Sequence, residues 1–203
     1  MSAAAPVDPV ITRMTDAEAT GHLIADTFHV DAITAWLVPR VEDRLPLQRR
    51  FFTMYAAHAM EHGDVYGIHE AGELAGVAVW FTAPFPEIPG EREAIDTFAG
   101  ENAERYHALG ELLEKLHPRE PHHYLNFIAL ERGRTGRGLG TVLLEEHHRR
   151  LDAEGAPAYL EASSEASRRL YLRHGYVDMP ELVRLPGGPV MYPMWREPRP
   201  PAG

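Results

Sequence analysis

Hydrophobic residues follow two different periods along this chain, and the change from one to the other predicts its elements. Short apolar runs rich in β-formers predict strands, and apolar residues three or four apart predict helices. The predicted order is β-α-α-β-β-α-β-α-β-α-β-β, a mixed and mostly antiparallel sheet of about seven strands with helices on both faces. The predicted strands are Val10–Met14, Val65–His69, Leu74–Thr82, Tyr124–Leu130, Ala158–Ala162, Tyr176–Arg184 and Val190–Trp195.

Capping residues and helix breakers bound the predicted helices. Thr15 and Glu18 have the spacing of a capping box, and Pro46 is a residue that favours the first turn of a helix. Glycine and proline residues mark the helix ends. The five helices of this order are Thr15 to Phe28, Pro46 to Gly63, Glu91–Leu116, Val142–Glu154 and Ser164 to His174, and a further short helical stretch is predicted over Ala32–Leu37.

Length and composition predict one domain over residues 1–203. The chain has 203 residues and 44% hydrophobic content, enough for a full core. It contains neither an internal repeat nor a linker long enough to separate two domains. Residues 1–8 and 197–203, the second stretch rich in proline, are expected to be flexible tails.

Charge and cysteine content exclude several classes of function. The formal net charge of −10 disfavours nucleic acid and anionic membranes as partners. The absence of cysteine excludes disulfides, thiolate nucleophiles and cysteine-bound metals. No apolar run approaches the roughly 18 residues of a membrane span, and the N-terminus lacks the pattern of a signal peptide. A cytoplasmic protein is therefore expected.

The most informative segment is a glycine-rich turn, Thr135–Thr141, which follows the predicted strand Tyr124–Leu130 and opens a helix. The backbone N–H groups at a helix start lack partners and carry partial positive charge, so such a turn is suited to bind phosphate. Additional positive charge in the same loop comes from Arg132, Arg134 and Arg137.

Two nucleotide-binding motifs fit this turn poorly. A P-loop requires a Gly-Lys-Ser/Thr sequence, and no lysine follows these glycines. A dinucleotide fingerprint requires G-x-G-x-x-G, whereas Gly136, Gly138 and Gly140 are evenly spaced. A tight strand–helix connection without any ligand is the remaining structural alternative.

The chain resembles the GCN5-related N-acetyltransferase (GNAT) superfamily in two motifs. Thr135–Gly140 aligns with the family's Q/R-x-x-G-x-G/A turn, although threonine stands at the first position and the neighbouring Arg134 is the residue that can compensate. Leu170–Tyr176 resembles the family's F/L-Y-x-x-x-G-F/Y signature, and Leu160–Ser163 resembles its fifth strand. Within the superfamily the chain is similar to puromycin N-acetyltransferase-like proteins.

The resemblance implies acetyl-CoA as a co-substrate. In such proteins the pantetheine arm lies between two strands that splay apart, so backbone groups of Ile128, Ala129 and Leu130 are expected to bind it. The turn is expected to bind the diphosphate. The other residues expected to bind the coenzyme are Arg134, Thr135, Gly136, Arg137, Gly138, Leu139, Gly140, Thr141 and Ser167.

Transfer of an acetyl group to an amine requires an acid for the leaving thiolate and an acceptor for the amine proton. Tyr171 is the predicted acid, because a phenol is protonated at neutral pH and its reference pKa lies near that of a thiol. Glu161 is the predicted base or substrate anchor, because a carboxylate is rarely found in a buried strand unless it has a function or a partner. The structural alternatives are packing for Tyr171 and an ion pair with Arg168 or Arg169 for Glu161.

The predicted acceptor is the amine of a small molecule, and an antibiotic or aminonucleoside-like amine is one hypothesis. A peptide or protein N-terminus is the open alternative. The resemblance places five residues near the acceptor and is compatible with a monomer or a homodimer. The five are Trp36, Tyr55, Trp80, Tyr124 and Asn126.

Two rival functions belong to other classes. His58, Glu61 and His62 form an H-x-x-E-H string, the pattern of one group of zinc peptidases, but no further acidic motif offers a third ligand, so no metal is expected. A non-catalytic acyl-CoA sensor would keep the glycine turn without needing Tyr171 or Glu161.

Overall fold

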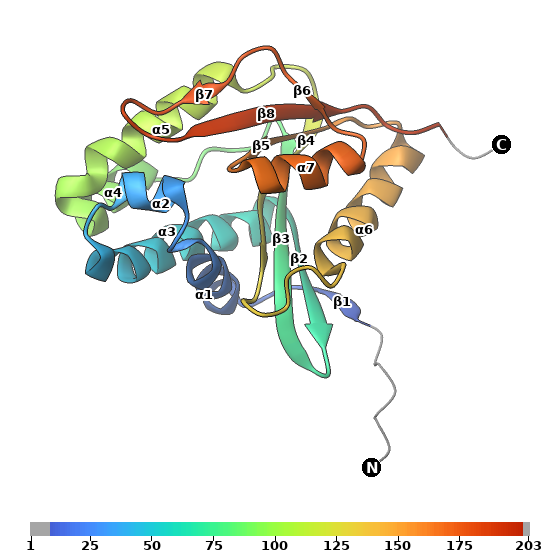
Figure 1. Ribbon diagram of the computed structural model, residues 1–203, viewed down its shortest axis with the longest axis horizontal. Helices are drawn as coiled ribbons and strands as arrows, with labels where there is room; N and C mark the ends of the chain where they lie inside the picture. Colours follow the sequence, from blue (N-terminus) through green and yellow to red (C-terminus); the bar gives the residue numbers. More distant parts are fainter. Residues whose placement is uncertain (1–8, 201–203) are drawn as a thin grey trace.

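A computed structural model describes residues 9–200 and confirms the predicted mixed α/β architecture (Figure 1). Eight strands form one sheet. They are β1 (Val10–Arg13), β2 (Gly63–Glu70), β3 (Glu73–Ala83), β4 (His122–Leu130), β5 (Ala158–Ala162), β6 (Val177–Asp178), β7 (Val183–Arg184) and β8 (Val190–Arg196). The helices are α1 (Ala17–Phe28), α2 (Ala32–Leu37), α3 (Val41–His62), α4 (Glu91–Ala99), α5 (Ala103–Leu116), α6 (Leu139–Glu154) and α7 (Glu165–Arg173), with a short 3₁₀ turn at Gly100–Asn102.

The sheet has the order β1-β2-β3-β4-β5-β8-β6, with β7 pairing to β8. All neighbouring strands are antiparallel except β4 and β5, which run parallel. This parallel pair is joined at only two positions, His123 with Ala158 and Tyr124 with Tyr159. Beyond Tyr124 the two strands separate, and the C-terminal half of β4 has no strand on its β5 side.

A bulge in β4 occurs where the strands separate. Val79 of β3 lies opposite Phe127, whereas the next residue, Trp80, lies opposite Leu125, so Asn126 is the extra residue. A bulge bends its strand and increases the local twist. The bend therefore directs the end of β4 away from β5 and opens the sheet.

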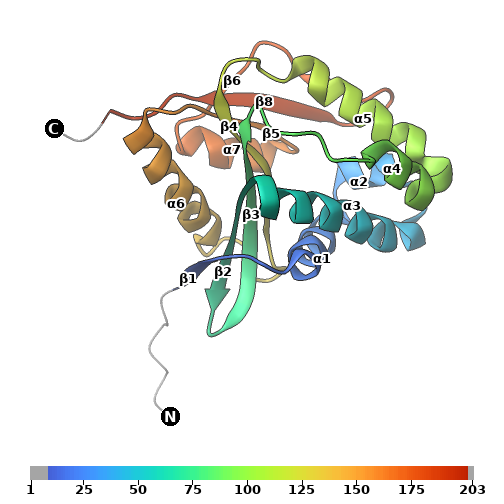
Figure 2. The same ribbon diagram turned by 180° about the vertical axis from the view of Figure 1, so that it is seen from behind.

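The helices form two layers, one on each face of the sheet (Figures 1 and 2). Helices α6 and α7 pack on one face over a core that includes Trp80, Leu143, Leu160 and Tyr171. Helices α1 and α3 cover the other face over a second core. A third core joins α2, α4, α5 and the β7 region. Successive strand residues point to alternate faces, so each strand contributes to both layers.

Three predicted helix boundaries were wrong. The cap of α1 is Asp16, whose side chain accepts the Ala19 N–H at 2.9 Å, rather than Thr15. Helix α3 begins at Val41, five residues before Pro46, because acidic residues populate its first turn and the proline removes only one internal hydrogen bond. The long helix predicted over Glu91–Leu116 is broken at Gly100, which has a positive φ of 53°.

The end of the chain also differs from its prediction. The single strand expected over Tyr176–Arg184 is two short strands, β6 and β7, separated by a segment that contains Pro180. Residues 1–8 and 201–203 of the predicted tails lie outside the described residues. Within residues 197–200, the Arg199 backbone N–H donates to Asp152 at 2.8 Å. Among the helices of residues 9–200, none combines the length and the apolar character needed to cross a membrane.

Candidate active site

The glycine turn lies between the end of β4 and the start of α6, where the sheet opens. Gly133, Gly136 and Gly138 have positive φ values of 89°, 76° and 85°. A side chain at any of the three would meet no atom within 4 Å, so packing does not require glycine there. The backbone conformation requires it, since L-residues with a β-carbon disfavour positive φ.

The first turn of α6 is free to bind an anion. Gly138 is the N-cap residue, no side chain caps the helix, and no acidic residue lies in the first turn. The first backbone N–H groups of a helix have no acceptor inside it and form the positive end of its dipole. The N–H groups of Leu139, Gly140 and Thr141 are donors of the kind that phosphate oxygens accept, and their binding of a diphosphate stays a prediction.

Gly140 has a different role from the other glycines of the turn. Its φ is not in the left-handed region, and a β-carbon there would lie 3.7 Å from Leu130 Cδ1 and 3.9 Å from Leu170 Cδ2. These are ordinary van der Waals contacts. The start of α6 thus packs between the end of β4 and helix α7, which brings three elements of the site together.

This difference predicts opposite outcomes for two alanine substitutions. Gly138→Ala places a β-carbon at positive φ, which costs about 1–2 kcal/mol, and should weaken coenzyme binding by distorting the turn. Gly140→Ala should bind the coenzyme as the wild type does, because its methyl group points towards Leu130 and Leu170. Isothermal titration calorimetry with acetyl-CoA measures both. Equal affinities for the two variants would contradict the proposed use of the turn.

The arginines of the loop are engaged with the β2–β3 hairpin. Arg134 pairs with Glu131, Glu73 and Glu70 at 2.5, 2.5 and 3.3 Å. Arg137 pairs with Glu70 at 3.0 Å. Arg134 therefore anchors the loop in this structure, and it must leave carboxylate partners to contact a coenzyme. Thr135, at the position of the family's glutamine or arginine, is exposed.

The free side of β4 presents the backbone expected to bind the pantetheine arm. Ile128, Ala129 and Leu130 pair with β3 on one side and lie beyond the last pairing with β5 on the other. The Thr27 hydroxyl of α1 donates to the Leu130 carbonyl at 3.0 Å, so this carbonyl already has a partner. Thr27 was missed from the sequence because the contact joins residues 103 positions apart.

Tyr171 lies on α7, on the α6 face of the sheet. The helix begins with a capping box in which Ser164 and Ser167 bond each other's backbone N–H, so Ser167 has a structural role here. The Tyr171 ring is buried, and burial raises the pKa of its phenol, which keeps it protonated. Its hydroxyl makes no side-chain hydrogen bond among residues 9–200, which leaves its proton available.

Glu161 points to the opposite face of the sheet. The Tyr124 hydroxyl donates to Glu161 Oε2 at 2.8 Å, whereas Oε1 is buried and has no hydrogen-bond partner within the described chain. Burial raises the pKa of this carboxyl to about 7, although the nearby Tyr159 hydroxyl and the hydrogen bond from Tyr124 oppose the rise. A carboxyl with this pKa can take up a proton near neutral pH.

The ion pair considered for Glu161 is not formed with Arg168. The Arg168 guanidinium pairs with Asp178 at 2.6 Å and with Glu165 at 3.1 Å. The Glu161 environment consists instead of aromatic hydroxyls from β4 and β5, including Tyr159, which the sequence analysis missed. Burial and the nearby carboxylate of Glu161 raise the Tyr159 pKa, so its hydroxyl is protonated.

Tyr171 and Glu161 therefore lie on opposite sides of the opening between β4 and β5. Tyr171 packs with the core under α6, which also contains Leu160 and Ala162. Glu161 is between these two in β5, so its side chain points to the other face. The structure places the phenol of Tyr171 and the carboxyl of Glu161 on the two faces of the sheet at this gap, with the glycine turn on the Tyr171 side.

The five residues predicted near the acceptor do not form one pocket. Trp80 is fully buried and stacks on His147 with ring centroids 4.1 Å apart, so it belongs to the core under α6. Trp36 packs against the third core, away from Glu161, and its indole N–H donates to the Pro186 carbonyl at 3.0 Å. The remaining three, on the Glu161 face or at the bulge, are Tyr55, Tyr124 and Asn126.

Glu91, bound by Tyr55, brings a second carboxylate to this region. The Tyr55 hydroxyl donates to Glu91 at 2.5 Å, and the Tyr55 ring lies 5.7 Å from the Phe127 ring at the bulge. Burial is the main cause of the raised pKa of Tyr55, and Glu91 adds to it. The pair brings negative charge from α4 to the aromatic surface beside β4.

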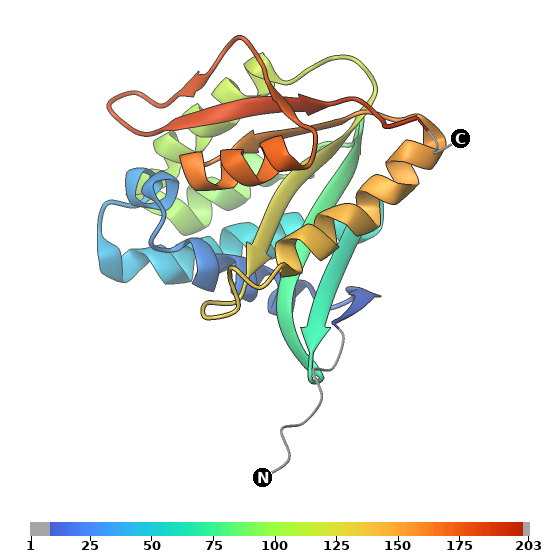
Figure 3. The same ribbon diagram turned by 45° about the vertical axis from the view of Figure 1, so that its right-hand side comes forward.

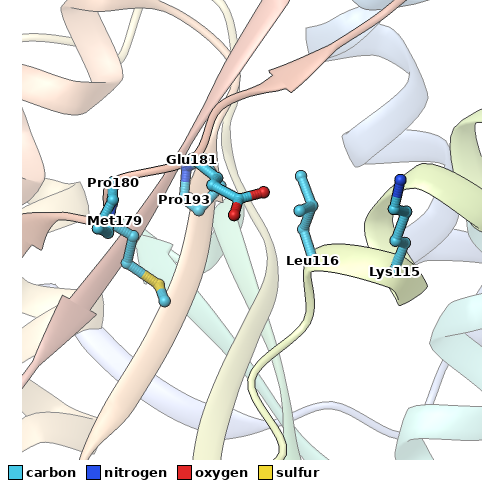
Figure 4. Close-up of a pocket in the computed structure, with 6 residues that line it drawn as sticks. All are labelled: Lys115, Leu116, Met179, Pro180, Glu181 and Pro193. Carbon is cyan, nitrogen blue, oxygen red and sulfur yellow. The ribbon is translucent and has the colours of Figure 1, made fainter.

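A cavity of about 410 Å³ lies beside β8, the strand that pairs with the strand of Glu161 (Figure 4). Pro193 of β8 is the register partner of Glu161, so their side chains are neighbours on one face. In Figure 4 the Glu181 carboxylate and the Leu116 side chain point towards each other across the space. The cavity lining is Lys115, Leu116, Met179, Pro180, Glu181 and Pro193.

The H-x-x-E-H string at the end of α3 does not form a metal site in this structure. His58 Nε2 lies 2.7 Å from the Pro86 carbonyl oxygen, and its ring contacts those of His62 and Phe81. Between residues 9 and 200, no three histidine or acidic side chains are grouped so that they could hold a metal ion. The histidines therefore pack the end of α3 against the β3–α4 connection.

The comparisons with known proteins agree with this geometry. The family model described as "Acetyltransferase (GNAT) family" matches residues 30–176, and the chain belongs to this family. Its members are acyltransferases, and the fold and enzyme class predicted from the sequence are confirmed. The family generally uses acetyl-CoA.

Solved structures with the same fold belong to proteins whose names refer to different substrates. A Corynebacterium glutamicum protein named histone acetyltransferase HPA2 and related acetyltransferase is 23% identical, with a TM-score of 0.74 over 97% of this chain and 100% of that one. Arylalkylamine N-acetyltransferase 2 of Aedes aegypti is 13% identical, with a TM-score of 0.63 over 95% and 100%. The ribosomal-protein-S18-alanine N-acetyltransferase of Escherichia coli is 16% identical, with a TM-score of 0.58 over 97% of both chains.

Proposed function

We propose that this protein transfers the acetyl group of acetyl-CoA to the amine of a small molecule by direct attack on the thioester. The observation that carries the proposal is the placement of Tyr171 and Glu161 on opposite faces of the gap between β4 and β5. An amine that enters from the Glu161 face and a thioester held along β4 meet in that gap.

The reaction requires one proton to leave the amine and one to reach the sulfur. The amine nitrogen bonds to the carbonyl carbon, and the carbon–sulfur bond breaks with its electron pair on sulfur. Glu161, whose pKa is raised to about 7, accepts the amine proton, directly or through water. Tyr171 gives its phenolic proton to the thiolate and regains one from solvent. Backbone N–H groups of the β4 edge stabilise the carbonyl oxygen.

The residues on the Glu161 face favour a small, cationic and partly aromatic acceptor. Tyr55 and Phe127 offer aromatic surface, and Glu91 offers a negative charge beside it. Two structures of the same fold are named for amines of this kind, arylalkylamine and agmatine N-acetyltransferases. An antibiotic or aminonucleoside-like amine, suggested by the resemblance to puromycin N-acetyltransferase-like proteins, belongs to the same chemical class.

A thiol-release assay across an amine panel tests the acceptor class. Arylalkylamines, diamines and aminonucleosides are expected to release coenzyme A thiol in the presence of acetyl-CoA, and peptides with a free N-terminus are expected to be poor acceptors. Release with peptides alone would replace the small-molecule proposal by peptide acetylation. If the protein binds acetyl-CoA but releases no coenzyme A thiol with any amine of the panel, the result would instead favour a non-catalytic sensor.

A further inference from the structure

A basic cavity beside the C-terminal half of α6 has no role in the proposed reaction. It measures about 280 Å³, and its lining comes from α6, the end of α7, the end of β8 and the segment after β8. Figure 3 shows α6 and α7 in front of the sheet, with the segment after β8 running to the C-terminal end of α6. Arginines from all these elements converge on it, in a chain whose net charge is −10. The basic side chains of its lining are His148, Arg149, Arg173, His174, Arg196 and Arg199.

Arg196 is a buried cation with an unused donor. Its side chain is 1% exposed, and it pairs with Asp152 at 2.7 Å and donates to the His174 carbonyl at 3.2 Å. Its Nη1 is fully buried and has no hydrogen-bond partner in the part of the chain that the structure describes. A buried charged donor without a partner is unfavourable, so a ligand at this position would stabilise the protein.

Arg199 brings a second guanidinium to the same place. A β-carbon at Gly175 would lie 3.4 Å from Arg199 Nη2 and 4.0 Å from Arg196 Nε, so both cations border this residue. The Arg199 backbone is held by Asp152, but its guanidinium pairs with no carboxylate within residues 9–200. Like charges at short range repel unless an anion lies between them. An anion bound beside the two guanidinium groups would reduce this repulsion.

The remaining lining leaves the cavity positive. Asp152 is already occupied by Arg196 and Arg199, and Glu145 is an exposed carboxylate at the cavity. His148 is neutral, because burial first and Arg196 second lower its pKa to about 3. Burial also lowers the His174 pKa. Arg149 is paired with Glu146, so the charge of the cavity depends on Arg173, Arg196 and Arg199 against Asp152 and Glu145. Guanidinium groups suit planar, two-point contact with phosphate oxygens.

We propose that this cavity binds a phosphate group. His174 connects it to the coenzyme turn, because its backbone carbonyl accepts from Arg196 and its Nε2 lies 3.2 Å from the hydroxyl of Thr141 in the first turn of α6. The phosphate has two possible sources. One is free phosphate, and the other, which rests on the proposed function, is the 3′-phosphate of the coenzyme itself.

Binding of inorganic phosphate to the full chain tests the site directly. Calorimetry should show binding to the wild type and about tenfold or more weaker binding to Arg199→Gln, which removes one charge-assisted partner. Arg173→Gln is a second variant from another element and should weaken binding in the same direction. Arg92→Gln, an exposed change on α4 with no contact to the cavity, should leave it unchanged. No binding to the wild type, or equal binding to Arg199→Gln, would overturn the proposal.

The source of the phosphate is identified by comparing the binding of coenzyme A with that of 3′-dephospho-coenzyme A. If the coenzyme supplies it, Arg199→Gln should weaken coenzyme A about tenfold and leave the dephospho form unchanged. If the ligand is free phosphate, it should bind equally to empty and coenzyme-loaded protein. Neither measurement needs an acceptor amine or turnover, so a protein that fails to acetylate can still show the site.

Discussion

Replacing Glu161 with glutamine is expected to reduce kcat/KM by about 10²- to 10⁴-fold at neutral pH, the usual contribution of a general base. Glutamine keeps the shape of the side chain and an acceptor for the Tyr124 hydroxyl, so the strand should remain in place. The acidic limb of the wild-type pH–rate profile should have an apparent pKa of about 7. That limb should be absent from the variant.

The same substitution should change how stability depends on pH. The native carboxyl keeps its proton up to about pH 7, whereas in the unfolded chain it loses the proton near the reference value of 4.5. The native state therefore binds more protons in this interval, and the free energy of unfolding falls as pH rises, by roughly 3 kcal/mol up to pH 8. Urea unfolding from pH 4.5 to 8 should show this loss in the wild type and a smaller one in Glu161→Gln.

Glu104→Gln is the matched control for Glu161. It removes one exposed carboxylate of α5 that makes no hydrogen bond among the described residues, and both its rate profile and its unfolding curve should follow the wild type. A Glu161→Gln variant with full activity and an intact acidic limb would show that another group takes the amine proton. The carboxyl would then have only a binding or structural role.

Replacing Tyr171 with phenylalanine is expected to lower kcat by about 10²-fold or more while leaving the affinity for acetyl-CoA unchanged. The ring would still fill the core under α6, so only the proton donor is lost. Because burial raises the phenol pKa above its ordinary value, the wild type should keep its acid form up to at least about pH 10. Steady-state kinetics and calorimetry with acetyl-CoA measure the two effects separately.

Tyr106→Phe provides the control for removing a buried hydroxyl. The Tyr106 hydroxyl on α5 is buried and lacks a hydrogen-bond partner in residues 9–200. Its removal should leave kcat unchanged and keep or raise the free energy of unfolding. Turnover of Tyr171→Phe within about twofold of the Tyr106→Phe value would refute the acid assignment, whatever its effect on stability.

Local sequence patterns were sufficient for most elements and for one part of the site. The strand, the glycine turn and the following helix could be predicted together, because φ preferences and helix-end chemistry act within a few residues. In the structure Gly136 and Gly138 have positive φ values and α6 begins without a side-chain cap, which fits a glycine-rich turn that opens a helix. The helix break at Gly100 was missed, since one glycine in a helical pattern does not by itself end a helix.

Contacts between distant residues could not be predicted in this way. The bulge at Asn126 depends on the register between β3 and β4, and it determines where β4 leaves β5. The burial of Trp80 under α6 and the pairing of Arg134 with the β2–β3 hairpin depend on which faces meet. Neither periodicity nor motif spacing contains that information, because strand alternation alone does not say which face a helix covers.

The sequence by itself indicated the family, most of the elements and a glycine-rich turn at the start of a helix, because these depend on residues that are neighbours in the chain. Only the tertiary structure decided that Glu161 and Tyr171 lie on opposite faces of one gap. It also decided that the Glu161 carboxyl is buried beside Tyr124, and this burial raises its pKa to about 7. The physical reason is that burial and strand divergence arise from packing between segments, which no local pattern specifies.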